Sequence, residues 1–175
     1  MINEAKTVLE NIVKKAAPKA TVVRSVAEES RAIMSRKFPL VALVTNPGTF
    51  DNDEARTLRY RDGEGRYQER YVRGTRSLPV LIRCWESGED GADALLTAII
   101  PEVPSRWEYD GFDGGVRIGF EEHSDHAGNL SKGYVSVVEV TFTAPAARQP
   151  NTAPLIEKTE PQGGEYARET FKGDL

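Results

Sequence analysis

The chain has 175 residues, of which 39% are hydrophobic and 29% are charged, a balance typical of a globular protein with one hydrophobic core. Lys and Arg number 23 against 27 Asp and Glu, and the resulting net charge of −4 gives no support to a dedicated nucleic-acid-binding protein. No apolar run is long enough for a membrane-spanning helix, and the single cysteine, Cys84, excludes an internal disulfide. We therefore expect synthesis in a reducing cytosol and no membrane partner.

The amino-terminal quarter of the sequence predicts two helices and one strand. Apolar side chains recur at helical spacing over residues 5–16, and Pro18 ends this first helix. Ser25 and Glu28 have the spacing of a capping box and indicate the start of a second, weaker helix. The apolar, β-branched run over residues 38–45 is short and ends at turn residues, which favours a strand buried on both faces near the centre of a sheet.

The middle of the sequence predicts a hairpin, a strand and a helix. Two polar arms over residues 56–73 flank the segment 62–65, which begins with Asp-Gly, a frequent tight-turn pair. Side chains alternate over residues 77–86, which predicts a separate strand with an apolar inner face. Ser87 is then expected to cap a helix with an acidic first turn, and Pro101 ends that helix.

The last third of the sequence predicts two further strands and an arm. A glycine-rich turn at residues 111–115 precedes one alternating strand, and residues 133–143 form another. Residues 144–175 contain four prolines and no periodicity, so they cannot build a core. We therefore expect an α+β domain over residues 1–143, with a mixed, mostly antiparallel sheet, two packed helices and a protruding β-hairpin, followed by an extended carboxy-terminal arm over residues 144–175.

Charge is distributed unevenly along the chain. Residues 1–83 carry 16 basic and 10 acidic side chains, a net charge of +6, whereas residues 84–175 carry 7 basic and 17 acidic side chains, a net charge of −10. Seven arginines lie within residues 56–76, interleaved with tyrosines. This hairpin could bind single-stranded nucleic acid, or be a solvated edge protected by charge. It could also be a basic surface that docks on the acidic surface of the next copy, and contacts of that kind close into rings.

One short segment gathers side chains that can bind a metal. Both histidines of the protein lie between residues 121 and 126, and a metal-dependent hydrolase would use Glu121, His123, Asp125 and His126. No second cluster of histidine or cysteine completes such a site, and polar residues are also expected wherever a strand runs into a solvated turn. We therefore expect a solvated turn, no cofactor and no catalytic residue.

The remaining candidates for chemistry have simpler interpretations. The acidic residues between 51 and 54 are expected to form a solvated connection, and the glycines do not have the spacing of a dinucleotide-binding loop. Cys84 lies on the predicted inner face of a strand and is interpreted as a packed, inert thiol. Trp85 and Trp107 flank strand ends, where they fit either an interface anchor or the rim of the core.

The predicted elements follow one another in a distinctive order over the first 143 residues. An amphipathic helix is followed by FPLVALVTN, by a long polar hairpin, by RGTRSLPVLIRCW leading straight into SGEDGADALLTAIIP, and then by VRIGFEE and GYVSVVEVTFTA. This order resembles the tail-terminator proteins of tailed bacteriophages, most closely over residues 74–101. The resemblance implies a small α+β protein that forms a hexameric ring on the tail tube, stops its growth and later docks to the neck of the head.

From this resemblance we expect a structural virion protein at the tail–neck junction, made in the host cytoplasm, and no enzymatic activity. Its partners would be further copies of itself, the tail tube and neck or connector proteins, with the sheath as a further candidate and DNA only as the passing genome. The apolar side chains of the arm could clamp a neighbour because an extended arm outreaches the domain. The residues expected at interfaces are Arg56, Arg59, Arg61, Arg66, Arg70 and Arg73 for the subunit contact, and Leu155, Ile156, Tyr166 and Phe171 for the arm.

Overall fold

The computed structural model of the chain describes residues 1–52, 56–61, 64–65, 67–126 and 133–147. Within these residues it has three α-helices and eight strands, which confirms the α+β class. None of the described helices combines the length and apolar character needed to cross a membrane. In chain order the elements are α1 (Ile2–Ala16), β1 (Thr21–Val23), α2 (Val26–Met34), β2 (Leu40–Thr45), β3 (Thr49–Asp51), β4 (Arg56–Arg61), β5 (Tyr67–Glu86), α3 (Glu89–Ile99), the 3-10 turn η1 (Ile100–Glu102), β6 (Arg106–Tyr109), β7 (Phe112–His126) and β8 (Gly133–Ala147).

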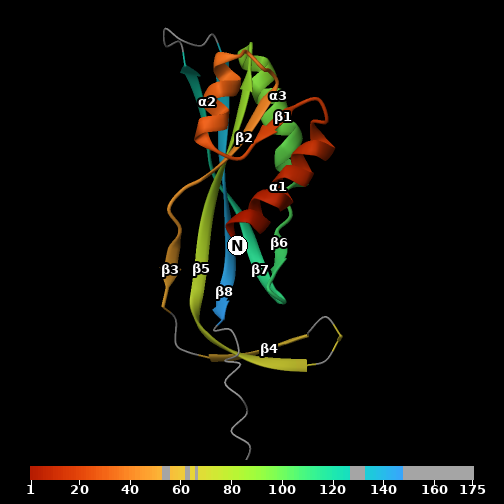
Figure 1. Cartoon of the computed structure of the whole chain (residues 1–175), viewed down its shortest axis with the longest axis vertical. Helices are drawn as coiled ribbons and strands as arrows, with labels where there is room; N and C mark the ends of the chain where they lie inside the picture. The colour runs from red at the N-terminus through yellow and green to blue at the C-terminus, as the bar shows by residue number, and fades with distance from the viewer. Residues whose placement is uncertain (53–55, 62–63, 66, 127–132, 148–175) are drawn as a thin grey trace, which may run out of the picture.

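The strands form one curled, mostly antiparallel sheet with the order β1-β2-β5-β8-β7-β6. Only β1 and β2 run parallel, while β3 and β4 pair one after the other with β5. The long strands β5, β7 and β8 follow the long axis of the domain (Figure 1). The prediction that β2 is buried on both faces is confirmed, but the central pair of the sheet is β5 and β8, and β2 is one strand away from the edge. It lies between the short edge strand β1 and β5.

The helices cover both faces of the sheet. Helices α1 and α3 bury their apolar sides against β2, β5 and β8, and Leu9 of α1 and Leu96 of α3 are fully buried there. Helix α2 covers the other face, where Ala32 packs on Leu40 and Trp85. The predicted capping box of α2 is confirmed in part, because the Ser25 hydroxyl caps the helix.

The start of α2 shows how a short helix of mixed polarity is fixed. The Ser25 hydroxyl accepts from the Glu28 backbone N–H at 3.3 Å, and the Glu28 carboxylate accepts from the Arg24 backbone N–H at 3.0 Å. The second bond reaches one residue further back than in an ordinary capping box. Because it favours the charged form, this bond from Arg24 is the main reason that the pKa of Glu28 is lowered.

Strand β5 joins two elements that the sequence pattern separates. We expected one arm of a hairpin ending near Arg73 and a new strand from Ser77, but the structure has a single strand of 20 residues. A β-bulge between Val72 and Thr75 shifts the pairing with β8 and re-aims the strand. The bulge breaks the alternation of side chains, which is why the pattern suggests two strands.

Three other boundaries differ from the sequence prediction. The turn between β6 and β7 is made by Asp110 and Gly111, which both have positive φ, as in the tight turns that favour Asp-Gly. Helix α3 is capped by Gly88 without a side-chain bond, so Ser87 is not its cap. Strand β8 continues to Ala147 and therefore takes in the first residues of the predicted arm.

Glycine is needed within β7 for close packing. The Trp107 indole crosses Gly114 and donates a hydrogen bond to the Thr143 carbonyl oxygen at 2.9 Å. A Cβ at position 114 would overlap both the indole nitrogen and that carbonyl oxygen. Gly114 therefore belongs to the packing of a strand and not to the predicted turn.

Candidate interface at the β4–β5 hairpin

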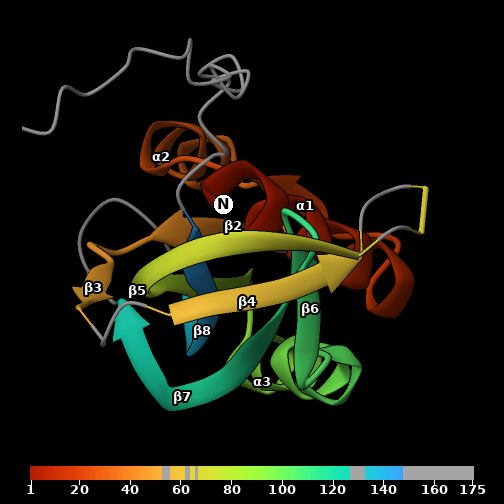
Figure 2. The same ribbon diagram turned by 90° about the horizontal axis from the view of Figure 1, so that it is seen from below.

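The predicted hairpin is confirmed, and its register sorts its side chains between two faces. Strand β4 pairs with β5 from Arg56 opposite Val72 to Arg61 opposite Tyr67. Residues directly opposite each other share a face, and the faces alternate along the strands. The hairpin lies across the lower end of the domain, over the ends of β6 and β8 (Figures 1 and 2). One of its faces therefore meets the domain and the other points away.

The inner face of the hairpin is held to the turn between β6 and β7. The Arg70 guanidinium donates to an Asp110 carboxylate oxygen at 2.6 Å and lies 5.7 Å from the centre of the Phe112 ring. The Arg70 side chain is only 16% exposed, and the neighbouring Val72 is buried. The inner contact, which we call the Arg70 latch, fixes the direction in which the hairpin projects.

The outer face of the hairpin carries charged and aromatic side chains. Arg59 is 76% exposed and forms a cross-strand ion pair with Glu69 at 2.8 Å. Tyr71 is half exposed on the same face, and Arg73 is exposed beside it. Arginine and aromatic residues are enriched in protein interfaces, and both also suit nucleic acid.

The expected interface residues do not form one set. Arg56, Arg59 and Arg73 are exposed, whereas Arg70 is committed to the latch and could not serve a partner without releasing it. Arg61 lies on β4 by its backbone, but its side chain lies outside the description, as does the whole of Arg66. The arm residues also lie outside the described residues: Leu155, Ile156, Tyr166 and Phe171.

The segment that carries the candidate metal ligands lies in a strand, although we expected a turn. The segment from Glu121 to His126 is the end of strand β7, paired with β8 as far as His126 opposite Gly133, and not a solvated turn. The side chains of Glu121, His123, Asp125 and His126 lie outside the description. Among the side chains that the structure does describe, no three histidine, cysteine or carboxylate groups come together as metal ligands would.

Cysteine and tryptophan belong to the core. Cys84 is fully buried, which confirms the interpretation as a packed thiol, and this burial raises the pKa of the thiol to about 12. Trp85 and Trp107 are both buried, so they belong to the core and are not exposed anchors. The Trp85 indole donates to the Glu29 carboxylate at 2.8 Å.

Sequence reasoning missed the buried carboxylate of Glu29. It also accepts a bond from the Arg83 guanidinium at 3.1 Å and so ties α2 to β5. In the sequence, the burial of Glu29 is indicated only by its position three residues before Ala32, which places both residues on the same side of the helix.

Comparison with known proteins does not add a family. No protein-family model matches the chain, and no curated protein matches it.

Proposed function

We propose that the protein is a structural virion component that forms a ring, caps the tail tube and joins it to the neck. The order of elements that suggested the resemblance occurs in the fold: α1, the buried β2, the hairpin, β5 leading directly into α3, and then β7 and β8. The proposed location is the tail–neck junction of the virion, and the proposed role is assembly and not catalysis.

The observation that carries the proposal is the two-sided hairpin. A hairpin that only protects a sheet edge needs charge but no fixed direction. Here the Arg70 latch fixes the ribbon across one end of the domain, and the opposite face presents Arg59, Tyr71 and Arg73. A rigid, exposed surface of arginine and tyrosine is what a protein partner would recognise. We propose that this face contacts a neighbouring protein of the assembly and that the arm clamps another.

The test uses tail-tube protein encoded by the same genome. Polymerising tubes with the wild-type protein should give shorter tubes that carry a ring at one end in negative-stain electron microscopy. The variant Arg59→Glu with Arg73→Glu should fold normally and fail to bind tubes, because two cations of the outer face become anions. The matched control, Arg106→Glu with Arg117→Glu, makes the same change of charge at exposed residues away from the hairpin and should bind.

Two results would overturn the proposal. Tubes that keep their length and bare ends in the presence of the wild type would exclude a capping role. Tight binding of single-stranded DNA at physiological salt, lost in the hairpin variant and kept in the control, would instead establish the nucleic-acid function.

A further inference from the structure

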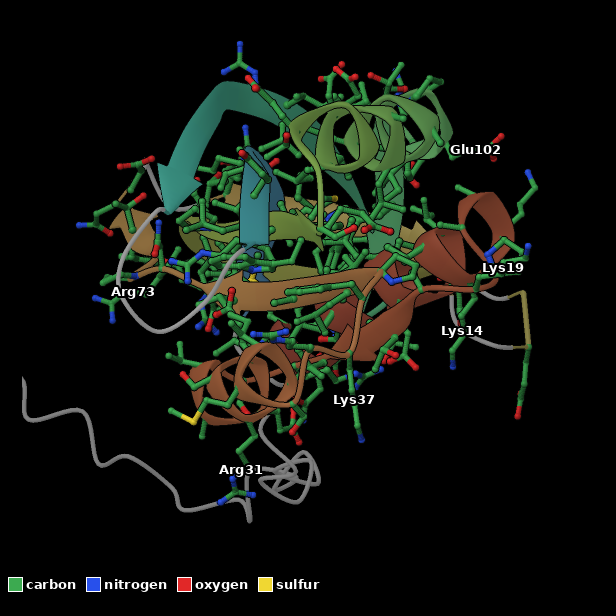
Figure 3. The ribbon with its side chains drawn as sticks, turned by 90° about the horizontal axis from the view of Figure 1, so that it is seen from above. Lys14, Lys19, Arg31, Lys37, Arg73 and Glu102 are labelled. Atoms are coloured by element: carbon green, nitrogen blue, oxygen red, sulfur yellow. The ribbon has the colours of Figure 1, made fainter. Side chains whose placement is uncertain are left out.

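The fold arranges the uneven charge of the sequence on two opposite edges of the sheet. Helices α1 and α2 lie on either face of the edge formed by β1 and β2, while α3, β6 and β7 lie towards the other edge. Seen along the long axis, Lys14, Lys19, Arg31 and Lys37 lie on the α1–α2 side, whereas Glu102 lies after α3 where η1 meets the end of α1, and there it pairs with Lys15 (Figure 3).

The two edges carry opposite net charge. Residues 1–37, which we call the basic edge, have 8 basic and 4 acidic side chains, a net charge of +4. Residues 86–113, which we call the acidic edge, have 1 basic and 8 acidic side chains, a net charge of −7. Both ranges are described throughout. These two ranges contain much of the excess charge of the two parts of the sequence, +4 of the +6 before residue 84 and −7 of the −10 after residue 83.

Many of these charges are not neutralised within the chain. Some are: Lys14 pairs with Glu10, and Lys15 pairs with Glu102 across α1 and η1. Other exposed charges have no ion-pair partner within the described residues, and there are four of them on each edge. They are Lys19, Arg31, Arg36 and Lys37 on the basic edge, and Glu89, Asp90, Glu108 and Asp113 on the acidic edge.

One pair on the acidic edge is unfavourable in the isolated chain. Glu108 of β6 and Asp113 of β7 are directly opposite in the register, and both are exposed. Like charges in such positions repel each other. A cation brought by another molecule would remove this repulsion.

Exposed apolar side chains accompany the charges. Val26 and Met34 of α2 are 53% and 74% exposed, two large apolar side chains on a helix of nine residues. Towards the opposite edge of the sheet, Ile118 of β7 is 45% exposed. Apolar side chains surrounded by charged ones are the usual composition of an interface with a polar rim.

We propose that the acidic edge of one copy of this chain docks on the basic edge of a second copy, with Met34 and Val26 in the contact. Because the two surfaces differ, the contact is heterologous and repeats from copy to copy until a ring closes. This inference rests on the proposed function, because the contact matters for assembly only if the protein forms a ring. It assigns the contact between neighbouring copies to the two edges of the sheet. The outer face of the hairpin then stays free for the tail tube.

The experiment exchanges the charges of the two edges. One variant, Lys19→Glu with Arg31→Glu, Arg36→Glu and Lys37→Glu, is acidic on both edges. The other, Glu89→Lys with Asp90→Lys, Glu108→Lys and Asp113→Lys, is basic on both edges. In sedimentation velocity at low salt, each variant alone should associate at least about 100-fold more weakly than wild type, because it meets only like charge. An equimolar mixture should regain the association, because the two variants complement each other.

Controls separate charge from fold. The variant Arg56→Glu with Arg76→Glu reverses two exposed cations that lie outside both edges and outside the outer face of the hairpin, and it should associate like wild type, whereas Arg31→Glu with Lys37→Glu reverses two cations of the basic edge and should weaken association. Association of the wild type and of the mixture should weaken at high salt, since the screening length falls from about 10 Å at 0.1 M to about 3 Å at 1 M. Circular dichroism checks that every variant is folded.

The inference falls if the mixture stays monomeric at low salt up to about 1 mM protein, which is the limit of weak but specific binding. It also falls if the control variant loses association as fully as the first edge variant. Failure here leaves the tail function intact if the wild type still caps tubes. Conversely, association of the mixture without any effect on tubes would establish the edge contact and remove the capping role.

Discussion

The Arg70 latch predicts a difference between two arginines of the same hairpin. Replacing Arg70 by Ala removes an ion pair to Asp110 and the contact with the Phe112 ring, from a side chain that is 16% exposed. Replacing Arg59 by Ala removes an ion pair of similar length, 2.8 Å against 2.6 Å, from a side chain that is 76% exposed. The two substitutions have the same chemistry and differ in burial.

The expected losses of stability differ several-fold. A hydrogen bond to a charged group contributes about 1.5 to 3 kcal/mol, and a cation over an aromatic ring adds about 0.5 to 1 kcal/mol. Asp110 is half exposed and can be solvated when Arg70 is gone, so the penalty for a stranded charge is small. We therefore expect Arg70→Ala to lower the free energy of unfolding by about 2 kcal/mol. An exposed pair such as Arg59–Glu69 is worth less than about 1 kcal/mol.

Urea denaturation of both variants measures these losses. A double-mutant cycle with Asp110→Asn isolates the ion pair, because asparagine keeps the positive φ of the turn while it removes the charge. Hydrogen exchange of the hairpin amides should accelerate in Arg70→Ala and stay unchanged in Arg59→Ala. Equal losses for the two arginines, or a coupling energy near zero between positions 70 and 110, would refute the latch.

Three further outcomes follow from the fold. Deleting residues 144–175 should lower the free energy of unfolding by about 1 to 3 kcal/mol in urea, because three of the first four pair with β5, namely Ala144, Pro145 and Ala147, whereas deleting only residues 148–175 should leave it unchanged. Gly114→Ala should displace the neighbouring indole and shift tryptophan fluorescence, while Gly88→Ala, where an added Cβ meets nothing within 4 Å, should not. Because burial raises its pKa to about 12, Cys84 should resist alkylation at pH 8 until urea unfolds the protein; rapid alkylation of the native protein would contradict its buried position.

Elements defined by local pattern could be predicted from the sequence. Helix α1 and the hairpin follow directly from spacing and turn residues, and β8 follows from strict alternation. The end of β8 could not be predicted, because residues 144–147 include a proline and are held in place by pairing with β5, some 70 residues earlier in the chain. Long-range pairing of this kind leaves no local signal.

The faces of the hairpin show the same limit at the candidate site. Arg59 and Arg70 are indistinguishable in the sequence, since both lie in a polar, arginine-rich stretch. Which of them turns inward depends on the register of β4 against β5 and on Asp110, 40 residues away from Arg70. Charge composition predicts a basic and an acidic part of the chain, but only the fold shows that residues 1–37 lie towards the β1–β2 edge and residues 86–113 towards the β6–β7 edge.

The continuity of β5 has a mechanical consequence. One strand of 20 residues runs from the hairpin through the middle of the sheet to the start of α3, with β8 on one side and β2 on the other for its upper half. Above the bulge, from Thr75 to Glu86, the strand follows the long axis of the domain, so a pull along that axis acts along its length, whereas the hydrogen bonds to both neighbours lie across it (Figure 1). These bonds must then shear together instead of opening one after another. The domain can thus carry a load along β5, from the bulge to the start of α3, without unzipping.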